Sequence, residues 1–426
     1  MARPRRNPIV VSTLGNAVAP LASLATAPIL ASALEPAGRG VVAAATAPLL
    51  LAVALASLGL PSALTHWVAR QPAILRPAMV VAAVVSAAVG GVTTALVALL
   101  SPTLAGGDPA LASLIGLAGI ALVPNLLAAL LQAVAAGLHA WRLVTIERVV
   151  TQSSRLLVIA VLAATGTLTV EGAITAIALS PVLGALVYLH LLRRSRAASN
   201  ADASTLRAGV LLSYGGRVWL GALSGIILSR IDQSLLLPLA GAAALGLYAV
   251  AVNIADVPLI VANAVREVSF SKHSADTDHA GLARAARLTT AVVLVVAAGL
   301  TAVLPFAVPW LFGAGYAEAV PVAAVLLLGL VLGSPGSLAG VGLAAVGRPG
   351  LRSVSLAIAA VCSIATLVLL APIAGALGAA VATLVGNVVS AGGNLVFLRR
   401  VAGMPVLPFF GLRRGDLGAV RALLPR

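Results

Sequence analysis

Polar and charged side chains interrupt two long apolar runs between Ser213 and Lys272, and they are the first candidates for chemistry. A charge at the centre of a membrane helix costs about 2.5–3.5 kcal/mol, so it persists only where it pairs or faces water. Arginine suits phosphate oxygens, and a carboxylate can balance its charge or take up a cation. The residues in question are Arg217, Arg230 and Asp232 in the first run, and Asn253, Asp256, Asn263, Arg266 and Glu267 in the second.

In the first run, Arg217, Ser224 and Asp232 share a broad sector of the predicted helix, whereas Arg230 points elsewhere. One interpretation makes Arg217 and Arg230 cavity cations that bind a diphosphate, with Asp232 balancing their charge. The alternative places Arg230 and Asp232 at the outer membrane interface, where they pair locally and extend to water.

The second run places its polar residues on one helix face. The steps from Asn253 to Asp256, Asn263 and Glu267 are three, seven and four residues, which is helical spacing. We interpret this face as an ion-coupling or charge-balancing surface, with Asp256 as its deepest carboxylate. The alternatives are a structural buried pair for Asp256 and ordinary interfacial charges for Arg266 and Glu267.

A third polar face is predicted where Arg148, Gln152 and Arg155 recur at steps of four and three residues. It would enter the membrane from the cytoplasm, with Arg155 about 10 Å inside at the rise of a helix. Arg155 then needs an anion, a carboxylate or water. We interpret Arg148 and Arg155 as substrate-binding cations, although Arg148 also fits a topological role and Arg155 could instead pair with Glu147.

The composition places these residues in a membrane protein. Hydrophobic residues make up 61% of the chain and charged residues 9%, with a mean hydropathy of +1.10, which is far more apolar than a soluble core requires. The single cysteine, Cys362, excludes an intrachain disulfide and a cysteine-based metal site. None of the histidines has metal-binding spacing, so the sequence predicts no metal centre and no cofactor.

Apolar runs of roughly 20 residues or more, separated by breaks, predict about twelve membrane-spanning helices. The polar segment Arg193–Leu206 separates two sets of six. Two expected spans lie within Ser213–Lys272. The other ten are expected near Val10–Ala33, Gly40–Trp67, Pro77–Leu100, Leu111–Gly137, Glu147–Thr165, Glu171–Leu192, Leu282–Pro305, Glu318–Val346, Ser353–Leu370 and Ala376–Leu398.

Basic residues fall on alternate loops between these spans. The opposite loops carry Glu35, Asp108, Glu171 and Glu318, with Arg39 as their clear basic exception. By the positive-inside rule, both termini are expected in the cytoplasm. This pattern accounts for most of the net charge of +15, so no nucleic-acid partner is predicted, and contact with anionic membrane lipid is expected.

A weak internal repeat relates the two sets of spans. Leu34–Ala43 (LEPAGRGVVA) matches Ala240–Ala249 (AGAAALGLYA), which aligns Gly40 with Gly246. Each glycine opens a helix after a short outer turn. Because six is an even number of spans, the two halves have the same orientation and are expected to be related by an axis along the membrane normal.

These observations predict an all-α polytopic membrane protein with about twelve transmembrane helices in two six-helix lobes. The lobes are expected at residues 1–200 and 201–400, followed by a basic cytoplasmic tail at 401–426. Parallel repeats of this kind place a substrate site at the lobe interface, near the bilayer midplane.

Two stretches resemble a known transporter family. Ile29–Arg70 (ILASALEPAGRGVVAAATAPLLLAVALASLGLPSALTHWVAR) resembles the first helix pair of the Wzx-like polysaccharide and oligosaccharide flippases, a branch of the multidrug/oligosaccharidyl-lipid/polysaccharide exporter superfamily. Arg230–Val252 (RIDQSLLLPLAGAAALGLYAVAV) resembles the seventh and eighth helices of that family, including its Arg-x-Asp and Gly-x-Tyr elements. The resemblance implies a central cavity between two lobes and movement of undecaprenyl-diphosphate-linked saccharides from the inner to the outer leaflet.

The sequence therefore favours a lipid-linked oligosaccharide flippase of the cytoplasmic membrane, not an enzyme. A cationic cavity would accept the diphosphate-sugar head while the polyprenyl chain stays in lipid, and a H⁺ or Na⁺ gradient could give direction. A cation-coupled drug exporter of the same superfamily is the main alternative. Aromatic residues are only 3% of the chain and deep arginines outnumber deep carboxylates, which favours the anionic substrate. A membrane glycosyltransferase would carry a catalytic carboxylate pair or a large outer loop, and neither is evident.

Overall fold

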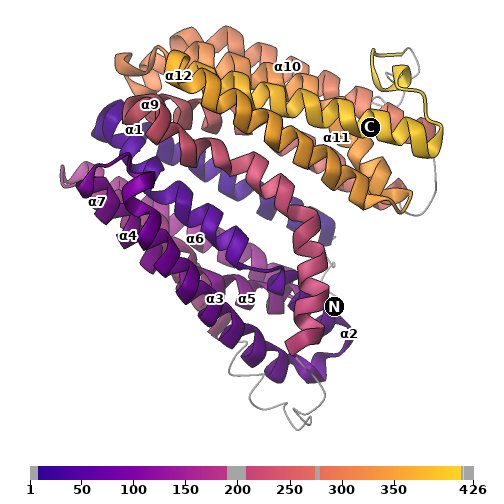
Figure 1. The fold of residues 1–426 in the computed structure, drawn as a ribbon, viewed down its shortest axis with the longest axis horizontal. Coiled ribbons are helices and arrows are strands. Elements are labelled where there is room, and N and C mark those ends of the chain that lie inside the picture. Colours follow the sequence, from indigo (N-terminus) through magenta and orange to yellow (C-terminus); the bar gives the residue numbers. More distant parts are fainter. Residues whose placement is uncertain (1–7, 190–207, 274–278, 414–415, 417–426) are drawn as a thin grey trace, which may run out of the picture. The chain divides into compact units, whose positions relative to one another are not determined.

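The computed structural model describes residues 8–189, 208–273, 279–413 and 416, and within these ranges the regular structure is entirely helical (Figure 1). Short 3₁₀ turns at Pro72–Ile74, Leu186–Tyr188, Ala314–Tyr316 and Leu407–Phe409 accompany the α-helices. The α-helices are α1 (Pro8–Ala56), α2 (Leu60–Arg70), α3 (Leu75–Leu104), α4 (Pro109–Ile120), α5 (Leu122–Gly137), α6 (Trp141–Ala164), α7 (Val170–Ala185), α9 (Ala208–His273), α10 (His279–Phe312), α11 (Ala319–Ala345) and α12 (Pro349–Ala402).

Three of the longest helices each contain one residue with a non-helical backbone, which divides the helix into two arms. These residues are Glu35 in α1 (φ 55°), Gly241 in α9 (φ 84°) and Gly375 in α12 (φ 55°). Glycine adopts positive φ readily, whereas a non-glycine residue there is uncommon and marks a tight turn. Each break falls between two expected spans. The described helices thus supply a helical segment for each of the twelve expected spans.

The structure differs from the expected spans in two places. The span expected from Gly40 to Trp67 is interrupted, because α1 ends at Ala56 and α2 begins at Leu60 after the left-handed residues Leu58 and Gly59. Pro61 lies in the first turn of α2, where its missing N–H is tolerated. The fourth expected span likewise divides into α4 and α5 at Ala121.

The chain is a multi-pass membrane protein. Eight of the described helical segments are long and apolar enough to cross a membrane, judged by length and composition. Helix α6 is not among them, because every stretch of it that could span includes Glu147, Arg148 and Arg155. It nevertheless packs against α1 and α7, so α6 carries these charges within a helical bundle.

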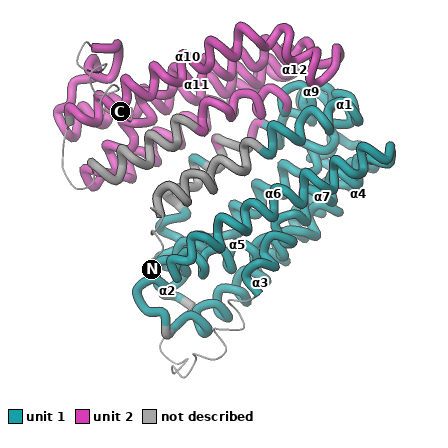
Figure 2. Tube along the Cα trace, turned by 180° about the vertical axis from the view of Figure 1, so that it is seen from behind, with its two compact units in different colours: residues 1–226, 233–249 teal, residues 227–232, 250–426 magenta. Residues whose placement is uncertain are grey.

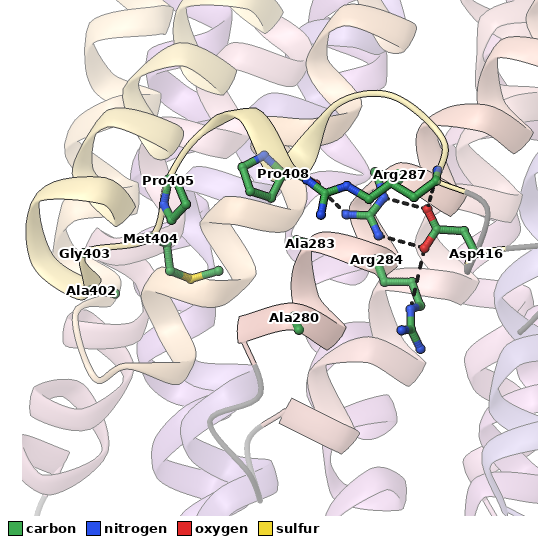
Figure 3. A pocket seen from close by; sticks show the side chains of 11 residues that line it. Ala280, Ala283, Arg284, Arg287, Ala402, Gly403, Met404, Pro405, Pro408 and Asp416 are labelled. Carbon is green, nitrogen blue, oxygen red and sulfur yellow. Dashed lines mark hydrogen bonds and ion pairs between the residues drawn. The ribbon is translucent and has the colours of Figure 1, made fainter.

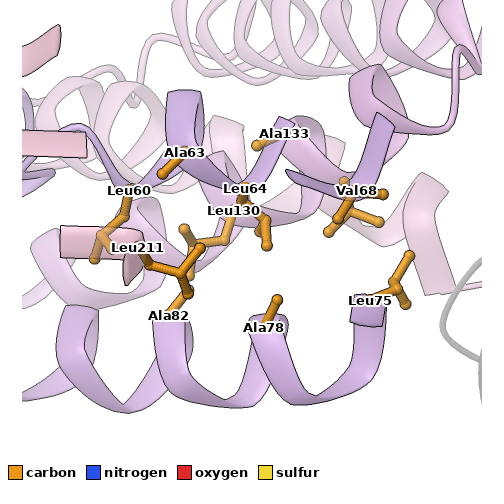
Figure 4. Close-up of a cluster of buried hydrophobic side chains, with 11 residues drawn as sticks. Leu60, Ala63, Leu64, Val68, Leu75, Ala78, Ala82, Leu130, Ala133 and Leu211 are labelled. Atoms are coloured by element: carbon orange, nitrogen blue, oxygen red, sulfur yellow. The ribbon is translucent and has the colours of Figure 1, made fainter. Parts of the chain in front are cut away.

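The chain forms two compact units (Figure 2). The first comprises residues 1–226 and 233–249. Within it, α2, α3 and α5 enclose an apolar cluster that also takes in Leu211, a fully buried residue near the start of α9 (Figure 4). Since lipid is as apolar as these side chains, close packing is what stabilises such a cluster in a membrane. Leu211 therefore anchors the beginning of α9 in the first unit.

The second unit comprises residues 227–232 and 250–426. Its helices α11 and α12 pack through small residues: a Cβ on Gly336 would overlap Ala391, and one on Gly329 would lie 3.1 Å from the Cα of Leu384. The buried Asn394 donates a 3.1 Å hydrogen bond from Nδ2 to the carbonyl of Gly336. Small residues with an interhelical amide bond are typical of membrane helix pairs. The lobe boundaries expected at residues 200 and 400 stay a prediction.

The two turns that the repeat aligns lie against each other in the first unit. A Cβ on Gly40 would overlap the carbonyl of Ala242, and a Cβ on Gly246 would overlap the carbonyl of Pro36. The latter Cβ would also lie 3.1 Å from the backbone nitrogen of Gly40. The contact is therefore reciprocal, and neither position has room for any side chain.

Candidate functional site

Arg217 lies near the start of α9, with an exposed side chain. Its Nε donates a 3.0 Å hydrogen bond to the carbonyl of Ser213, one turn earlier. The neighbouring Trp219 donates a 3.3 Å bond from Nε1 to the carbonyl of Ala54, which holds this part of α9 against α1. Arg217 has no ion pair with a carboxylate of the described residues, so its charge is available to a ligand. The side chain of Arg230 lies outside the described part of the structure.

Asp232 is a buried carboxylate, only 6% exposed. Thr383 of α12 donates a 3.3 Å hydrogen bond from its Oγ1 to Oδ2 of Asp232. A carboxylate that contacts another helix while shielded from solvent does not extend into water. Asp232 is thus shielded within the second unit, and its charge-balancing role stays a prediction.

The polar face predicted on the second arm of α9 is described only in part. Asn253 and Asp256 are partly buried. The side chains of Asn263, Arg266 and Glu267 lie outside the described residues. The ion-coupling role of this face stays a prediction.

Arg155 projects from α6 toward α1, where its Nη2 donates a 3.2 Å hydrogen bond to Oγ of Ser23. Its Nε is buried and has no hydrogen-bond partner among the described residues. Oε1 of Gln152, one turn earlier on the same helix, is also buried without a partner there. Buried polar atoms are normally satisfied by protein, water or ligand. Nε of Arg155 and Oε1 of Gln152 therefore form a candidate binding site for polar groups of a ligand or of water.

Glu147, also on α6, is the centre of a hydrogen-bonded cluster that sequence reasoning missed. The carboxylate is 8% exposed. It accepts bonds from Thr151 Oγ1 at 2.8 Å, Gln132 Nε2 at 2.9 Å and the Tyr188 hydroxyl at 3.4 Å. Gly184 of α7 makes this approach possible, because a Cβ there would overlap Oγ1 of Thr151. The cluster thus joins α5, α6 and the 3₁₀ turn that follows α7.

The alternative pairing of Arg155 with Glu147 is wrong. The two residues are eight positions apart on one helix, which separates them by about 12 Å along the axis. Glu147 turns to α5 and α7, whereas Arg155 turns to α1. Arg148, which follows Glu147 on this helix, is partly buried, and its substrate-binding role stays a prediction.

A second feature that the sequence did not indicate is an ion pair between α10 and the tail (Figure 3). Arg287 donates to both oxygens of Asp416, from Nε at 2.6 Å and Nη2 at 2.7 Å, and to the carbonyl of Pro408 from Nη1 at 2.6 Å. Arg284 lies 3.6 Å from the same carboxylate, and the backbone N–H of Arg413 donates to it at 2.9 Å. Hydrogen bonding to Arg287 lowers the pKa of Asp416 to about 2.

This ion pair predicts how tail docking depends on pH. Because the pKa of Asp416 in the folded protein lies below its ordinary value of 3.8, the stabilisation is complete above that ordinary value and is lost as pH falls toward 2. We expect the hydrogen–deuterium exchange of residues 404–410, corrected for intrinsic rates, to be constant from about pH 8 to pH 5 and to rise below about pH 4. An Asp416→Asn variant should exchange faster at neutral pH, and the difference from the wild type should shrink as pH falls toward 2. Equal exchange in the two proteins at neutral pH would contradict the role of this carboxylate.

Comparison with known proteins identifies both a family and a fold. Residues 6–270 match the model of a family described as polysaccharide biosynthesis protein. No curated protein matches the chain.

Several solved transporters have a similar fold. One is the lipid II flippase MurJ in an inward closed conformation, with a TM-score of 0.75 and 12% identity, covering 96% of this chain and 92% of that one. Another is an inward-facing MATE-family multidrug resistance transporter of the MOP superfamily, with a TM-score of 0.69 and 16% identity, covering 90% and 94%. A third is a MOP-superfamily transporter from Pyrococcus furiosus described as having a binding pocket of reversed polarity, with a TM-score of 0.60 and 16% identity, covering 94% and 97%. At these identities the likeness concerns the fold alone.

Proposed function

Since the chain belongs to the polysaccharide biosynthesis protein family, we propose that it is a flippase for polyprenyl-diphosphate-linked oligosaccharides. It would move them across the cytoplasmic membrane for cell-surface polysaccharide assembly, with both termini in the cytoplasm. The family match and the transporter fold support this class of function. The proposed reaction is transport, in which no covalent bond of the substrate changes.

The observation that carries the proposal is the incomplete hydrogen bonding of Arg155. A guanidinium group stays charged in any protein environment, and leaving one of its donors buried and unpaired costs about 1–3 kcal/mol. Among the described residues its polar contact is a neutral hydroxyl, that of Ser23. A diphosphate head supplies several anionic oxygens with the geometry that a guanidinium prefers. Substrate binding would therefore remove the cost of the unpaired donor.

The other predicted residues are assigned to the same cycle. Arg217, which is exposed and not paired to a described carboxylate, would be a second cation for the diphosphate, and Arg148 and Arg230 would add to the cationic surface. Asp232, with its contact to Thr383, and the face that carries Asp256 would balance charge or couple transport to H⁺ or Na⁺. The polyprenyl chain would remain in lipid while two lobes alternate access to the head group.

Reconstitution provides the direct test. Purified protein is placed in vesicles that contain an undecaprenyl-diphosphate-linked oligosaccharide, and the sugar accessible to an external glycosidase is followed over time. We expect digestion to go to completion with the protein and to stop at the outer-leaflet pool in protein-free vesicles. If both vesicle types stopped at the same pool, while protein-containing vesicles transported a cationic dye, the drug-exporter alternative would replace this proposal.

A further inference from the structure

A pocket of about 520 Å³ lies within the second unit, between the start of α10, the end of α12 and the residues that follow α12 (Figure 3). We call it the tail pocket. Its walls are apolar at Ala283 and Met404, and its charged lining residues are Arg284, Arg287, Arg413 and Asp416. Its volume falls in the range of about 300–1,000 Å³ that is usual for small-molecule sites.

The charges of the tail pocket do not balance. Three arginines face one carboxylate, and Asp416 is already committed to Arg287 through two short hydrogen bonds. Arg284 is only a distant partner at 3.6 Å, and its side chain is 51% exposed. Arg413 contacts Asp416 through its backbone N–H, and its side chain is exposed. Among the described residues, the pocket therefore offers two guanidinium groups that no carboxylate binds closely.

The position of the tail pocket in the fold indicates where its ligand comes from. Membrane-span candidates begin at Ala280 in α10 and end at Ala402 in α12, and both residues line the pocket. The start of one span and the end of another therefore meet at the same membrane surface. Arg284 and Arg287 lie near the start of α10, and Arg399 and Arg400 lie in the last turn of α12. The positive-inside rule predicts that these basic helix ends face the cytoplasm. The pocket thus lies at the level of the lipid headgroups.

We propose that the tail pocket binds the phosphate headgroup of an anionic phospholipid of the inner leaflet. Arg284 and Arg413 hold the phosphate oxygens, and the apolar wall at Ala283 and Met404 lies beside the glycerol end. Asp416 fixes Arg287 and the tail, so that the remaining two arginines define the site. This site is separate from the diphosphate site around Arg155 and does not depend on the transported substrate.

The experiment measures lipid binding to the detergent-solubilised full-length protein by native mass spectrometry. The probes are phosphatidylglycerol, zwitterionic phosphatidylethanolamine and inorganic phosphate. The test variant carries Arg284→Gln with Arg413→Gln. Its matched control carries Arg399→Gln with Arg400→Gln, which removes the same charge from exposed positions that do not line the pocket.

We expect the wild type to prefer phosphatidylglycerol. The test variant should bind it roughly thirtyfold more weakly, since each of the two basic residues contributes about fivefold. The control should change by less than about threefold, because Arg399 and Arg400 do not line the pocket and act on the headgroup only through screened charge at a distance. Ala280→Phe, which fills the pocket from an exposed position without changing charge, should also weaken binding. Equal losses in the test variant and the control would overturn the proposal. Displacement of the lipid by inorganic phosphate would assign the site to soluble phosphate and likewise overturn it.

Discussion

The Arg155→Ala protein is expected to bind diphosphate-linked oligosaccharide about 10- to 100-fold more weakly than the wild type, because hydrogen bonds to a charged group contribute about 1.5–3 kcal/mol. Transport at low substrate concentration should fall by the same factor. The change removes a charge and a set of donors whose contact within the described residues is the hydroxyl of Ser23. The folded state should lose little, since the wild-type side chain leaves its Nε buried and unpaired.

Two further variants separate charge from geometry at this position. Arg155→Lys keeps the positive charge but lacks the planar fork that contacts two phosphate oxygens at once, so we expect only partial recovery of binding. Arg76→Ala removes an exposed basic residue that has no described ion pair and should bind and transport like the wild type.

The measurements are equilibrium binding of the lipid-linked substrate in detergent and initial transport rates in vesicles, each at matched protein amounts. If Arg155→Ala protein bound and transported normally, Arg155 would not belong to the substrate site. If Arg76→Ala protein lost as much as Arg155→Ala protein, the effect would come from overall charge and not from this side chain.

The helical segments could be predicted from sequence because hydropathy and turn residues act locally. The turn after Ala33 occurs at Glu35, and the break between the last two expected spans occurs at Gly375. Helix α6 is too charged for a hydropathy criterion, yet it coincides with the span expected at Glu147–Thr165. The span expected from Gly40 to Trp67 did not include the break before Leu60. Proline is favoured in the first turn of a helix, but Pro61 alone does not show that the residues before it leave the preceding helix.

The polar contacts were harder to predict because they join helices that are distant in sequence. Thr383 and Asp232 are 151 positions apart, and no spacing rule relates them. The network around Glu147 combines residues from α5, α6 and the 3₁₀ turn that follows α7. One local signal was present: Gln132 and Glu147 are polar residues in consecutive spans, and a polar pair across neighbouring membrane helices commonly forms a hydrogen bond. The sequence contains only a weak indication of the partner of Arg287. Asp416 is the one acidic residue of an otherwise basic tail, which suggests an ion pair but does not identify the arginine.

Replacing Gly40 with valine is expected to reduce transport by about 100-fold or more, because the contact between the two aligned turns can no longer form. Any Cβ at Gly40 would overlap the carbonyl of Ala242. Overpacking against side chains costs about 1–3 kcal/mol, and a backbone carbonyl can yield less than a side chain. A cost of about 3 kcal/mol lowers the population of a conformation roughly 100-fold. Gly246→Val should have the same effect, since the contact is reciprocal.

Cross-linking reports this contact without reference to transport. In a Cys362→Ser background, Ala37→Cys and Ala243→Cys introduce one thiol into each turn at exposed positions. A short bifunctional maleimide should join them efficiently in the otherwise unchanged protein and severalfold less in the Gly40→Val protein. Gly91→Ala in α3, where an added Cβ would meet nothing within 4 Å, is the matched glycine control and should cross-link and transport normally.

The combination of the two readouts decides what the contact does. Loss of cross-linking together with loss of transport is the expected result. The charge pattern predicts that both turns lie on the outer side, where their contact would close the exit while substrate enters from the cytoplasm. Loss of cross-linking with normal transport would mean that the cycle does not require this closed arrangement. Normal cross-linking in Gly40→Val protein would show that the two turns still approach each other despite the added side chain. That result would contradict the steric argument.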